Sequence, residues 1–410
     1  MRPDIHIIAF DPPENSVVFV ERKGIGHPDT LADTLAEALS RNYSLYTQKR
    51  YGAVLHHNFD KTGILGGKSF VSFGKGRLTT PVKVLVNGRL SASFGGENIP
   101  YEKIISETVY EFFGEIFGNL IPHDMVAIEM NISSASSPGH ADANTNGSAR
   151  NNWFNPQSLD DLPEVRHLFS NDTSIGCGYY PMHPLETFVL DLERALSVGE
   201  FKKNHTWMGS DVKVMGTQIQ DAIDITLCVP QIANFVSNLD EYKANLQEVR
   251  AFLDGYAKEK LGRTDVRFNM NTRDDYDKVE LYLTATGSSI ESGDEGLVGR
   301  GNRVNQVISI NHPMSMEGAA GKNPVYHVGK LYYLAAHKVA QAMYQKFGVY
   351  NEVYLVSQSG RSLTSPWKTV VKIDKNKRLA IQEVKKFIAD QLQAIPSITE
   401  EVIHDKVSIS

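Results

Sequence analysis

The most informative segment of the chain reads Gly293-Asp294-Glu295-Gly296-Leu297-Val298-Gly299-Arg300-Gly301-Asn302-Arg303, and it is followed by Gly321-Lys322-Asn323-Pro324-Val325-Tyr326-His327-Val328-Gly329-Lys330. Glycines let backbone amides approach an anion, and the interleaved arginines and lysines can add charge-assisted hydrogen bonds. The pattern favours a polyphosphate site. Composition alone fits a solvated, glycine-punctuated surface loop equally well.

Regular secondary structure is predicted on both sides of this segment. Strands are expected at 17–20, 82–86, 125–132, 223–229, 279–286, 304–310, 350–356 and 370–373, and helices from residue 29 onward and at 104–117, 187–196, 239–261, 328–347 and 377–392. Strands and single helices recur three times without the strict alternation of a doubly wound sheet. This order favours α+β units with helices over one face of each sheet.

The first strand leads into a glycine-rich turn, Gly24-Ile25-Gly26-His27-Pro28-Asp29. A helix is predicted from Asp29 onward, because leucines recur at helical spacing after it. His27 and Asp29 then lie at a helix N-terminus, where either a capping or a binding role is open. The same periodicity predicts that Asp33 and Glu37 face solvent.

Composition limits the class of protein. Of the 410 residues, 41% are hydrophobic and 22% charged, which is typical of a globular chain with more than one unit. The net charge of −6 argues against a nucleic-acid partner bound by neutralising many phosphates. With only Cys177 and Cys228, no signal-peptide pattern and no run of about 18 apolar residues, the sequence predicts a cytoplasmic protein without a membrane partner.

Two other nucleotide-binding patterns are near misses. The stretch Thr62-Gly63-Ile64-Leu65-Gly66-Gly67-Lys68-Ser69 would be a phosphate-binding loop of the Walker type if its first residue were glycine. No Gly-x-Gly-x-x-Gly turn follows an early strand, so a Rossmann dinucleotide site has no support.

The chain resembles the archaeal-type S-adenosylmethionine synthetases, also called methionine adenosyltransferases. The resemblance rests on the two segments quoted first and on four others, Glu21-Arg22-Lys23-Gly24-Ile25-Gly26-His27-Pro28-Asp29, Leu55-His56-His57-Asn58-Phe59-Asp60, Asn171-Asp172-Thr173-Ser174-Ile175-Gly176 and Asp211-Val212-Lys213-Val214-Met215-Gly216. These motifs occur in the right order and span nearly the whole chain.

The resemblance implies a definite reaction. The methionine sulfur attacks C5′ of ATP, intact triphosphate leaves, and the triphosphate is cleaved to pyrophosphate and phosphate before release. A neutral thioether needs no general base, so the protein has to orient the reactants and stabilise charge on the leaving group. Mg²⁺ suits that task, and the resemblance implies two Mg²⁺ per site, with K⁺ as a further candidate.

Roles follow for individual residues from the resemblance. The expected catalytic residues are His27, which would donate to the leaving oxygen, Arg300 and Lys322. The expected ATP and phosphate contacts are Asp172, Asp211, Lys213, Arg303, His327 and Lys330, the expected amino-acid contacts are Asp294, Asp60 and Lys61, and the expected Mg²⁺ ligand is Asp29. For each, the alternative is a structural cap or a surface ion pair. His56 and His57 lack the further spaced ligands of a zinc site, so interface or substrate contacts are expected.

The resemblance also implies an architecture. Three similar sheet-plus-helix subdomains would be related by an approximate threefold axis, with approximate and interleaved ranges of 1–125, 126–285 and 286–410. A homodimer, with a tetramer as a further option, would share its active sites between subunits. His27, Asp29 and Asp60 would then face Arg300 and Lys322 of the partner.

The sequence departs from the family pattern at residues 133–155. A Gly-Gln-Gly-Ser-like loop is usual there, and this chain has the polar run Ser133-Ser134-Ala135-Ser136-Ser137-Pro138-Gly139-His140 and continues polar to Asn155. Lys61 and Lys68 add charge near the amino-acid end, and Gly329 stands near where other relatives carry a second Mg²⁺ carboxylate. Two alternatives to methionine adenosyl transfer therefore remain, a paralogue using another thioether or selenoether amino acid and a non-catalytic nucleotide-binding homologue.

Overall fold

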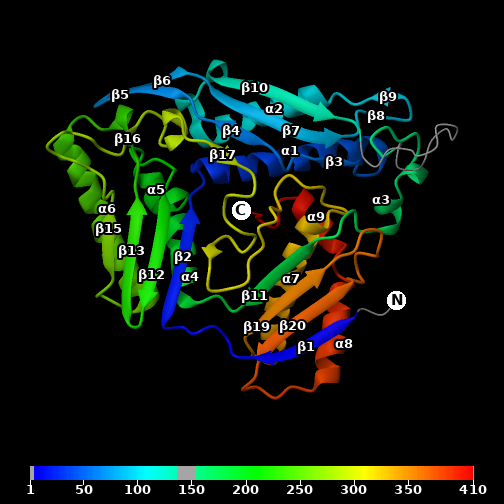
Figure 1. Cartoon of the computed structure of the whole chain (residues 1–410). Helices are drawn as coiled ribbons and strands as arrows, with labels where there is room; N and C mark the ends of the chain where they lie inside the picture. Colours follow the sequence, from blue (N-terminus) through cyan, green and yellow to red (C-terminus); the bar gives the residue numbers. More distant parts are fainter. Residues whose placement is uncertain (1–3, 136–152, 410) are drawn as a thin grey trace.

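The computed structural model describes residues 4–135 and 153–409 (Figure 1). Most of the divergent segment 133–155 lies outside these described residues. Three larger sheets, each of mixed parallel and antiparallel strands, are covered by helices, so the predicted α+β class is confirmed.

The first sheet packs against helices α1 (Pro28–Tyr51) and α2 (Tyr101–Phe117). Its order is β10 (Val126–Ser133), β7 (Val82–Leu90), β4 (Gly63–Leu65) and β17 (Gly296–Leu297), with β3 (His57–Asn58) also paired to β7. The short strand β17 belongs to the glycine-rich segment, which is therefore fixed to the edge of this sheet.

The second sheet packs against α4 (Pro184–Ser197) and α6 (Leu239–Leu261). Its order is β15 (Arg267–Met270), β13 (Ala222–Cys228), β12 (Lys213–Ile219), β2 (Val17–Lys23) and β18 (Ile308–Ser309). The strand β2 leads directly into α1, which packs on the first sheet. One strand and the helix after it thus belong to different sheets.

The third sheet packs against α7 (Val328–Phe347) and α8 (Ile381–Leu392), with α9 (Ser397–Ile403) following. Its order is β1 (Ile5–Phe10), β20 (Lys368–Asp374), β19 (Asn351–Val356) and β11 (Ile175–Tyr180). The strand β1, near the start of the chain, pairs with β20 of the late hairpin β19–β20, so segments far apart in the sequence are neighbours in this sheet (Figure 1).

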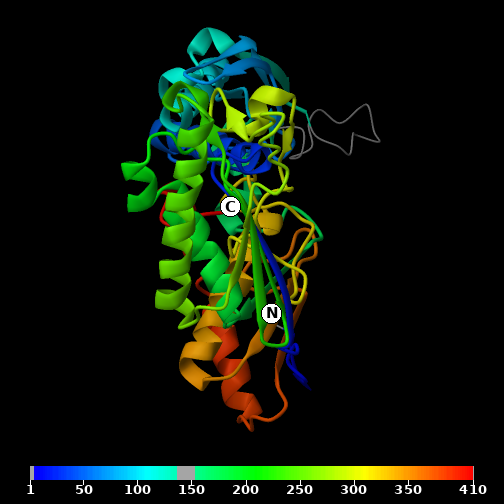
Figure 2. The same ribbon diagram turned by 90° about the vertical axis from the view of Figure 1, so that its left-hand side faces the viewer.

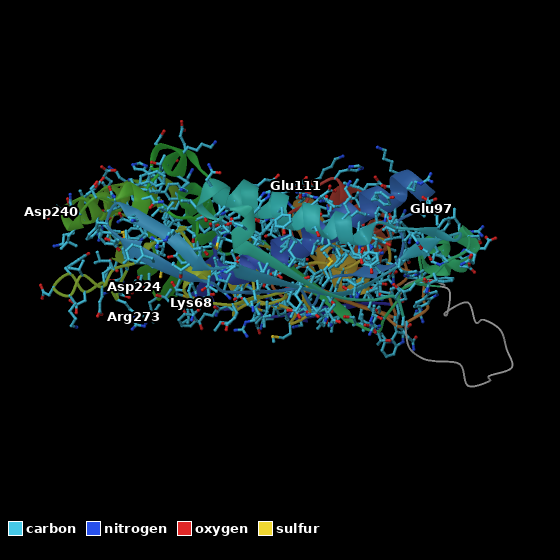
Figure 3. The ribbon with its side chains drawn as sticks, turned by 90° about the horizontal axis from the view of Figure 1, so that it is seen from above. Lys68, Glu97, Glu111, Asp224, Asp240 and Arg273 are labelled. Atoms are coloured by element: carbon cyan, nitrogen blue, oxygen red, sulfur yellow. The ribbon has the colours of Figure 1, made fainter. Side chains whose placement is uncertain are left out.

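The remaining elements are short connections between these units. They are β5 (Lys68–Ser72) with β6 (Lys75–Thr80), β8 (Ser93–Phe94) with β9 (Glu97–Asn98), β14 (Gln231–Ile232) with β16 (Leu283–Thr284), α3 (Pro163–His167) and α5 (Glu200–Asn204). In the side view the helices, such as α6, lie on one side and the strands on the other (Figure 2). Seen from above, Glu111 of α2 lies on the helical side, and Lys68 and Arg273 lie toward the opposite side (Figure 3).

The three sheets share one pattern of pairing. In each, an edge pair runs parallel (β10 with β7, β15 with β13, β1 with β20), and the following strands run antiparallel. Three of the long helices also begin in the same way, because His27, His183 and His327 cap α1, α4 and α7 by accepting a backbone N–H at Nδ1. A histidine cap uses the ring nitrogen as Ser or Asp caps use oxygen.

Some predicted elements differ from the observed ones. The helices predicted at 239–261 and 328–347 occur with those bounds. The predicted strand 279–286 is wrong for most of its length, since only β16 is extended there and Val279 has a φ of 57°. The predicted strand 304–310 is likewise reduced to β18. The first of these segments leads into the glycine-rich segment and the second leads out of it, and most of each is turn or irregular backbone.

Candidate functional site

His27 lies at the N-terminus of α1, directly after β2 and the glycine-rich turn that follows that strand. Its Nδ1 accepts a hydrogen bond from the Asp29 amide at 3.2 Å, so a neutral ring carries its proton on Nε2. Burial, and to a lesser extent the Lys23 charge, lowers the pKa of His27 to about 4. Near pH 7 the ring is therefore neutral, with one N–H available as a hydrogen-bond donor.

Asp29 joins the start of α1 to the glycine-rich segment. Its Oδ2 accepts from the Lys23 ammonium at 2.9 Å, and its Oδ1 accepts from the Leu297 amide at 3.2 Å. The Arg300 guanidinium lies 3.9 Å from the same carboxylate, and its side chain is 69% exposed. Arg300 is thus held close to Asp29 while its guanidinium remains accessible to a bound anion.

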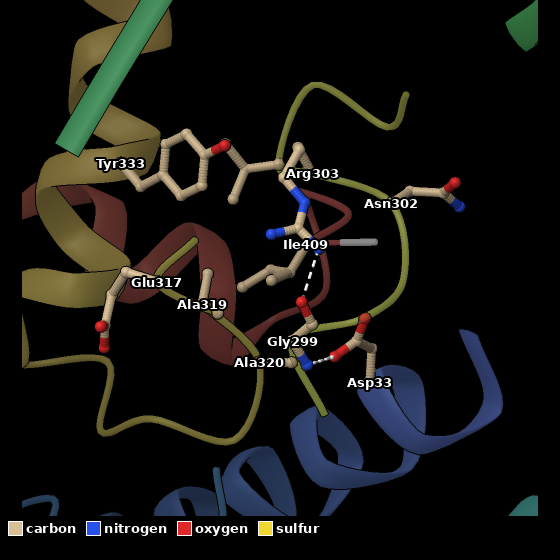
Figure 4. A pocket seen from close by; sticks show the side chains of 11 residues that line it. Asp33, Gly299, Asn302, Arg303, Glu317, Ala319, Ala320, Tyr333 and Ile409 are labelled. Carbon is tan, nitrogen blue, oxygen red and sulfur yellow. Dashed lines mark hydrogen bonds between the residues drawn. The ribbon is translucent and has the colours of Figure 1, made fainter. Parts of the chain in front are cut away.

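The backbone on both sides of Arg300 is tied to a second carboxylate of α1. Asp33 accepts a hydrogen bond from the Gly299 amide at 2.7 Å (Figure 4) and another from the Gly301 amide at 3.1 Å. Burial raises the pKa of Asp33 to about 7, against the opposing effect of these amides and of Arg303. With a residue exposure of 3%, Asp33 does not face solvent as predicted, because the glycine-rich segment covers that side of the helix.

Arg303 points into the protein and not toward the open side of the site. Its guanidinium donates to the carbonyls of Gly299, Gly301 and Ser315. Together with Asp33 and Glu317 it lines a small cavity of about 10 Å³ (Figure 4). This arrangement gives Arg303 a structural function in shaping the loop that carries Arg300.

Lys322 is the centre of a second charged group. Its ammonium touches the Glu317 carboxylate and lies 3.8 Å from Asp60, whose other neighbour is Lys61 at 2.8 Å. Burial lowers the pKa of Lys322 to about 8, and Asp60 opposes that shift. The Lys61 side chain is 73% exposed, so it lies at the open edge of this group.

Lys330 and His327 lie deeper in the same region. Lys330 is fully buried, and its ammonium donates to both oxygens of Glu37, at 2.7 and 2.8 Å. His327 accepts the Gly329 amide at 3.2 Å as the cap of α7, and burial lowers its pKa well below the usual value. These contacts hold both side chains inside the protein, where they support the loop that carries Lys322, which is itself buried.

Asp211 and Lys213 lie beside the first charged group. Asp211 accepts from the backbone and hydroxyl of Ser289 and from the Tyr282 hydroxyl, and burial raises its pKa to about 6. Lys213 lies 3.4 Å from Glu21 and remains part-exposed. Asp294 is exposed and contributes to the raised pKa of Asp211, so the two carboxylates are near one another.

The remaining predicted residues fall near Lys322. Asp172 is exposed, and its charge acts on the pKa of Lys322. His57 bonds to Ser40 at 2.7 Å, and His56 bonds to Tyr326 at 2.6 Å and stacks on Trp153. Both histidines are buried, which lowers the pKa of each to about 3. Their contacts are those of packed core side chains.

The structure therefore brings the predicted residues into two adjoining groups. One contains His27, Asp29, Arg300, Asp211, Lys213 and Asp294, and the other contains Asp60, Lys61, Asp172 and Lys322. Arg300 lies beside Asp29 of its own chain, and Lys322 lies beside Asp60 of its own chain. The expected pairing of these residues across subunits stays a prediction.

Sequence reasoning missed four residues of these groups as members of the site, Lys23, Asp33, Glu37 and Glu317. A usable signal existed for two of them, because Asp29, Asp33 and Glu37 recur every four residues and so share one helix face. Glu317 had no such signal, since it lies in a loop without periodicity.

The lowered pKa of Lys322 gives a pH-dependent expectation. The charged ammonium is present below about pH 8 and is lost as the pH rises through that value, so kcat/KM for a polyphosphate substrate should fall on the alkaline side. Replacement by arginine, which stays charged, should move this fall to higher pH. A pH profile of kcat/KM for both proteins measures the shift; an identical alkaline fall in both would contradict the assignment.

Within residues 4–135 and 153–409, no group of three or more His, Cys, Asp or Glu side chains is arranged to hold a metal ion. A Mg²⁺ ion often takes only one or two carboxylates and completes its shell with substrate phosphates and water, and Asp29 fits that use. In the same part of the chain, no helix is long and apolar enough to cross a membrane.

Comparison with known proteins gives a consistent result. Residues 6–406 match the family described as S-adenosylmethionine synthetase (AdoMet synthetase). The chain is 35% identical over 408 residues to the probable S-adenosylmethionine synthase of Aquifex aeolicus, covering 98% of both chains. It is 36% identical over 401 residues to the S-adenosylmethionine synthase of Haloarcula marismortui, covering 96% of this chain and 95% of that protein.

A solved structure supports the fold. It is described as an unusual S-adenosylmethionine synthetase from Campylobacter jejuni, and it matches with a TM-score of 0.59 and 14% identity over 94% of this chain and 88% of that one. At this identity the match concerns the fold alone. Taken with the nearly full-length relatives, these findings establish that the chain belongs to the S-adenosylmethionine synthetase family, in its archaeal type.

Proposed function

We propose that this chain is an S-adenosylmethionine synthase that transfers the adenosyl group of ATP to methionine. The sulfur lone pair forms a bond to C5′, the bond from C5′ to the triphosphate oxygen breaks, and water then cleaves triphosphate to pyrophosphate and phosphate. The observation that carries the proposal is that the two glycine-rich loops of Arg300 and Lys322 are both hydrogen-bonded to α1, the helix that a neutral His27 caps.

The side chains are suited to the steps of this reaction. A neutral sulfur needs no base, so catalysis depends on orientation and on stabilising the charge that develops on the leaving triphosphate. His27, with its proton on Nε2, would donate to the leaving oxygen. Arg300, exposed at the edge, and Lys322, charged below about pH 8, would bind the phosphate groups.

Asp29 would hold Mg²⁺ together with phosphate oxygens. Bound Mg²⁺ neutralises charge on the triphosphate and helps to orient it. The Asp29 carboxylate now accepts from Lys23, so metal binding would require Lys23 to shift toward another partner, and Glu21 lies 3.9 Å from its ammonium. A second Mg²⁺ and a K⁺ remain part of the proposal, with ligands drawn mainly from substrate.

The other polar residues would contact the two substrates. Asp294 would meet the amino group of methionine, and Asp60 with Lys61 would lie at the same end. Asp211, Lys213 and Asp172 would contact the nucleotide. Arg303, His327 and Lys330 would act indirectly, by supporting the loops on which Arg300 and Lys322 lie.

We also infer an approximate threefold relation among subdomains centred on ranges 1–125, 126–285 and 286–410. The shared strand pairing, the three large hydrophobic cores and the three histidine caps support it. Exposed apolar side chains at Phe70, Leu297 and Met316, the last 90% exposed, support a homodimer, with a tetramer as its further assembly.

A panel of acceptors tests the choice of substrate. The purified chain is incubated with ATP, Mg²⁺ and either methionine, selenomethionine or another thioether amino acid, and adenosylated products are measured by mass spectrometry. We expect the highest kcat/KM with methionine. A product formed with another thioether and not with methionine would identify a paralogue and contradict the proposed acceptor.

A further inference from the structure

The segment that follows α9 crosses α1 and then returns to the interior. In it, Asp405 turns the chain with a φ of 55°, and its carboxylate pairs with Arg41 of α1 at 2.6 Å. Further along, Ile409 is buried, with an exposure of 7%, in the core that α7 and the third sheet share. The path of this segment is therefore fixed at two points, by an ion pair on α1 and by the burial of Ile409.

The Ile409 side chain lies beneath the loop 299–303, which carries Arg300. It lines the small cavity of about 10 Å³ to which Asp33 and Arg303 also belong (Figure 4). The apolar residues that line this cavity beside Ile409 are Val304, Ala319, Ala320 and Tyr333. Ile409 thus comes from a segment far along the chain and covers the inner side of the glycine-rich segment.

The loop has little apolar cover of its own on this side. A Cβ atom added to Gly318 would lie 2.9 Å from the Cα of Gly299, so the two backbones meet directly. Neither residue has a side chain that could keep water out of the cavity. The cover beneath the loop therefore depends on neighbouring side chains such as Ile409.

The cavity is the place where the backbone of the loop is held. The Arg303 guanidinium donates to the carbonyls of Gly299 and Gly301, and the Asp33 carboxylate accepts the amides of the same two residues. Hydrogen bonds are stronger where water is excluded. A side chain that closes this cavity therefore strengthens the contacts on both sides of Arg300.

We propose that Ile409 is a positioning residue for Arg300, because it closes the cavity in which Asp33 and Arg303 hold the loop. The Arg300 side chain itself extends away from the cavity and is 69% exposed. The inference rests on the proposed function insofar as Arg300 binds a phosphate group of ATP, whichever subunit supplies the remaining contacts.

Hydrogen–deuterium exchange, followed by mass spectrometry, tests the positioning without any substrate. In Ile409→Ala, a peptide covering residues 296–304 should exchange about tenfold faster than in the wild-type chain, because the amides of Gly299 and Gly301 lose protection. Ile409→Leu, which keeps the volume of the side chain, should restore slow exchange. If Ile409→Ala does not fold, Ile409→Val should show the same effect at a smaller size.

Ile398→Ala is the matched control. Ile398 has an exposure of 2% and belongs to the same core, but it lies on α9 and lines the groove between α7 and α8. Its truncation should lower thermal stability and leave exchange of the peptide 296–304 unchanged.

Kinetics then tests whether the effect reaches the site through Arg300. Ile409→Ala should raise KM for ATP about fivefold, since a displaced binding group is costly, and Ile398→Ala should leave KM unchanged. In an Arg300→Ala background, Ile409→Ala should raise KM by less than about twofold more, because the group that it positions is already absent.

The outcomes separate this inference from the proposed function. Unchanged exchange in Ile409→Ala, equally fast exchange in Ile398→Ala, or a full effect of Ile409→Ala in the Arg300→Ala background would overturn the positioning role. Faster exchange in Ile409→Ala alone, in a chain that forms no adenosylated product, would support the positioning of the loop while rejecting the proposed reaction.

Discussion

Replacing Lys322 by alanine is expected to lower kcat by about a hundredfold or more, which corresponds to about 2.7 kcal/mol of transition-state stabilisation. The Lys322 ammonium is buried next to Asp60 and Glu317, and the backbone of its loop is hydrogen-bonded to α1 at Gly321 and Lys322. Negative charge grows on the triphosphate as the C5′ bond breaks, so a fixed cation there contributes most in the transition state. Steady-state kinetics with ATP and methionine measures the loss.

Lys338→Ala is the matched control for this variant. Lys338 lies on α7, ten residues after the buried start of that helix, and pairs with Glu401 at the surface. Its removal should change kcat by less than twofold. Near-normal turnover of Lys322→Ala, or an equal loss in both variants, would count against the assigned charge-stabilising role.

The second large effect is expected at His27. Alanine at this position removes both the cap of α1 and the Nε2 donor, so stability should fall by about 1 kcal/mol and kcat by about a hundredfold. Asparagine separates these functions, because its side-chain oxygen can cap the helix as the His27 ring does. His27→Asn should therefore retain thermal stability and still lose kcat.

His183 offers a control of the same chemistry. It caps α4 by accepting the Leu185 amide at 3.1 Å, as His27 caps α1, but α4 belongs to the second sheet and its core. His183→Ala should lower the free energy of unfolding by a similar amount and leave kcat unchanged. If His27→Asn keeps full kcat, as His183→Ala is expected to, then His27 only caps the helix and has no catalytic role.

Much of the fold follows from local patterns in the sequence. The helices 239–261 and 328–347 were predicted with their observed bounds, because long periodic segments with good end signals leave little choice. The pairing of strands into sheets could not be predicted in this way. β2 and β17 each pair in one sheet while the helix or loop beside them packs elsewhere, and no local pattern encodes such distant pairing.

The site shows the same division. The residue types and spacing of the glycine-rich motifs favoured a polyphosphate site, and the resemblance added the roles of Arg300, Lys322 and His27, which stay predictions. The prediction that Asp33 and Glu37 face solvent was wrong for Asp33 and incomplete for Glu37, which bonds to Gly321 and Lys330. Periodicity identifies residues that share a face, but it does not reveal that distant loops cover it.

The most direct test of adenosyl transfer follows all products of one reaction. The purified chain is mixed with ATP, Mg²⁺ and methionine, and S-adenosylmethionine, pyrophosphate, phosphate, ADP and AMP are measured over time. We predict equal amounts of S-adenosylmethionine, pyrophosphate and phosphate, all strongly reduced in Lys322→Ala. Formation of ADP or AMP without S-adenosylmethionine, or no consumption of ATP, would contradict the account.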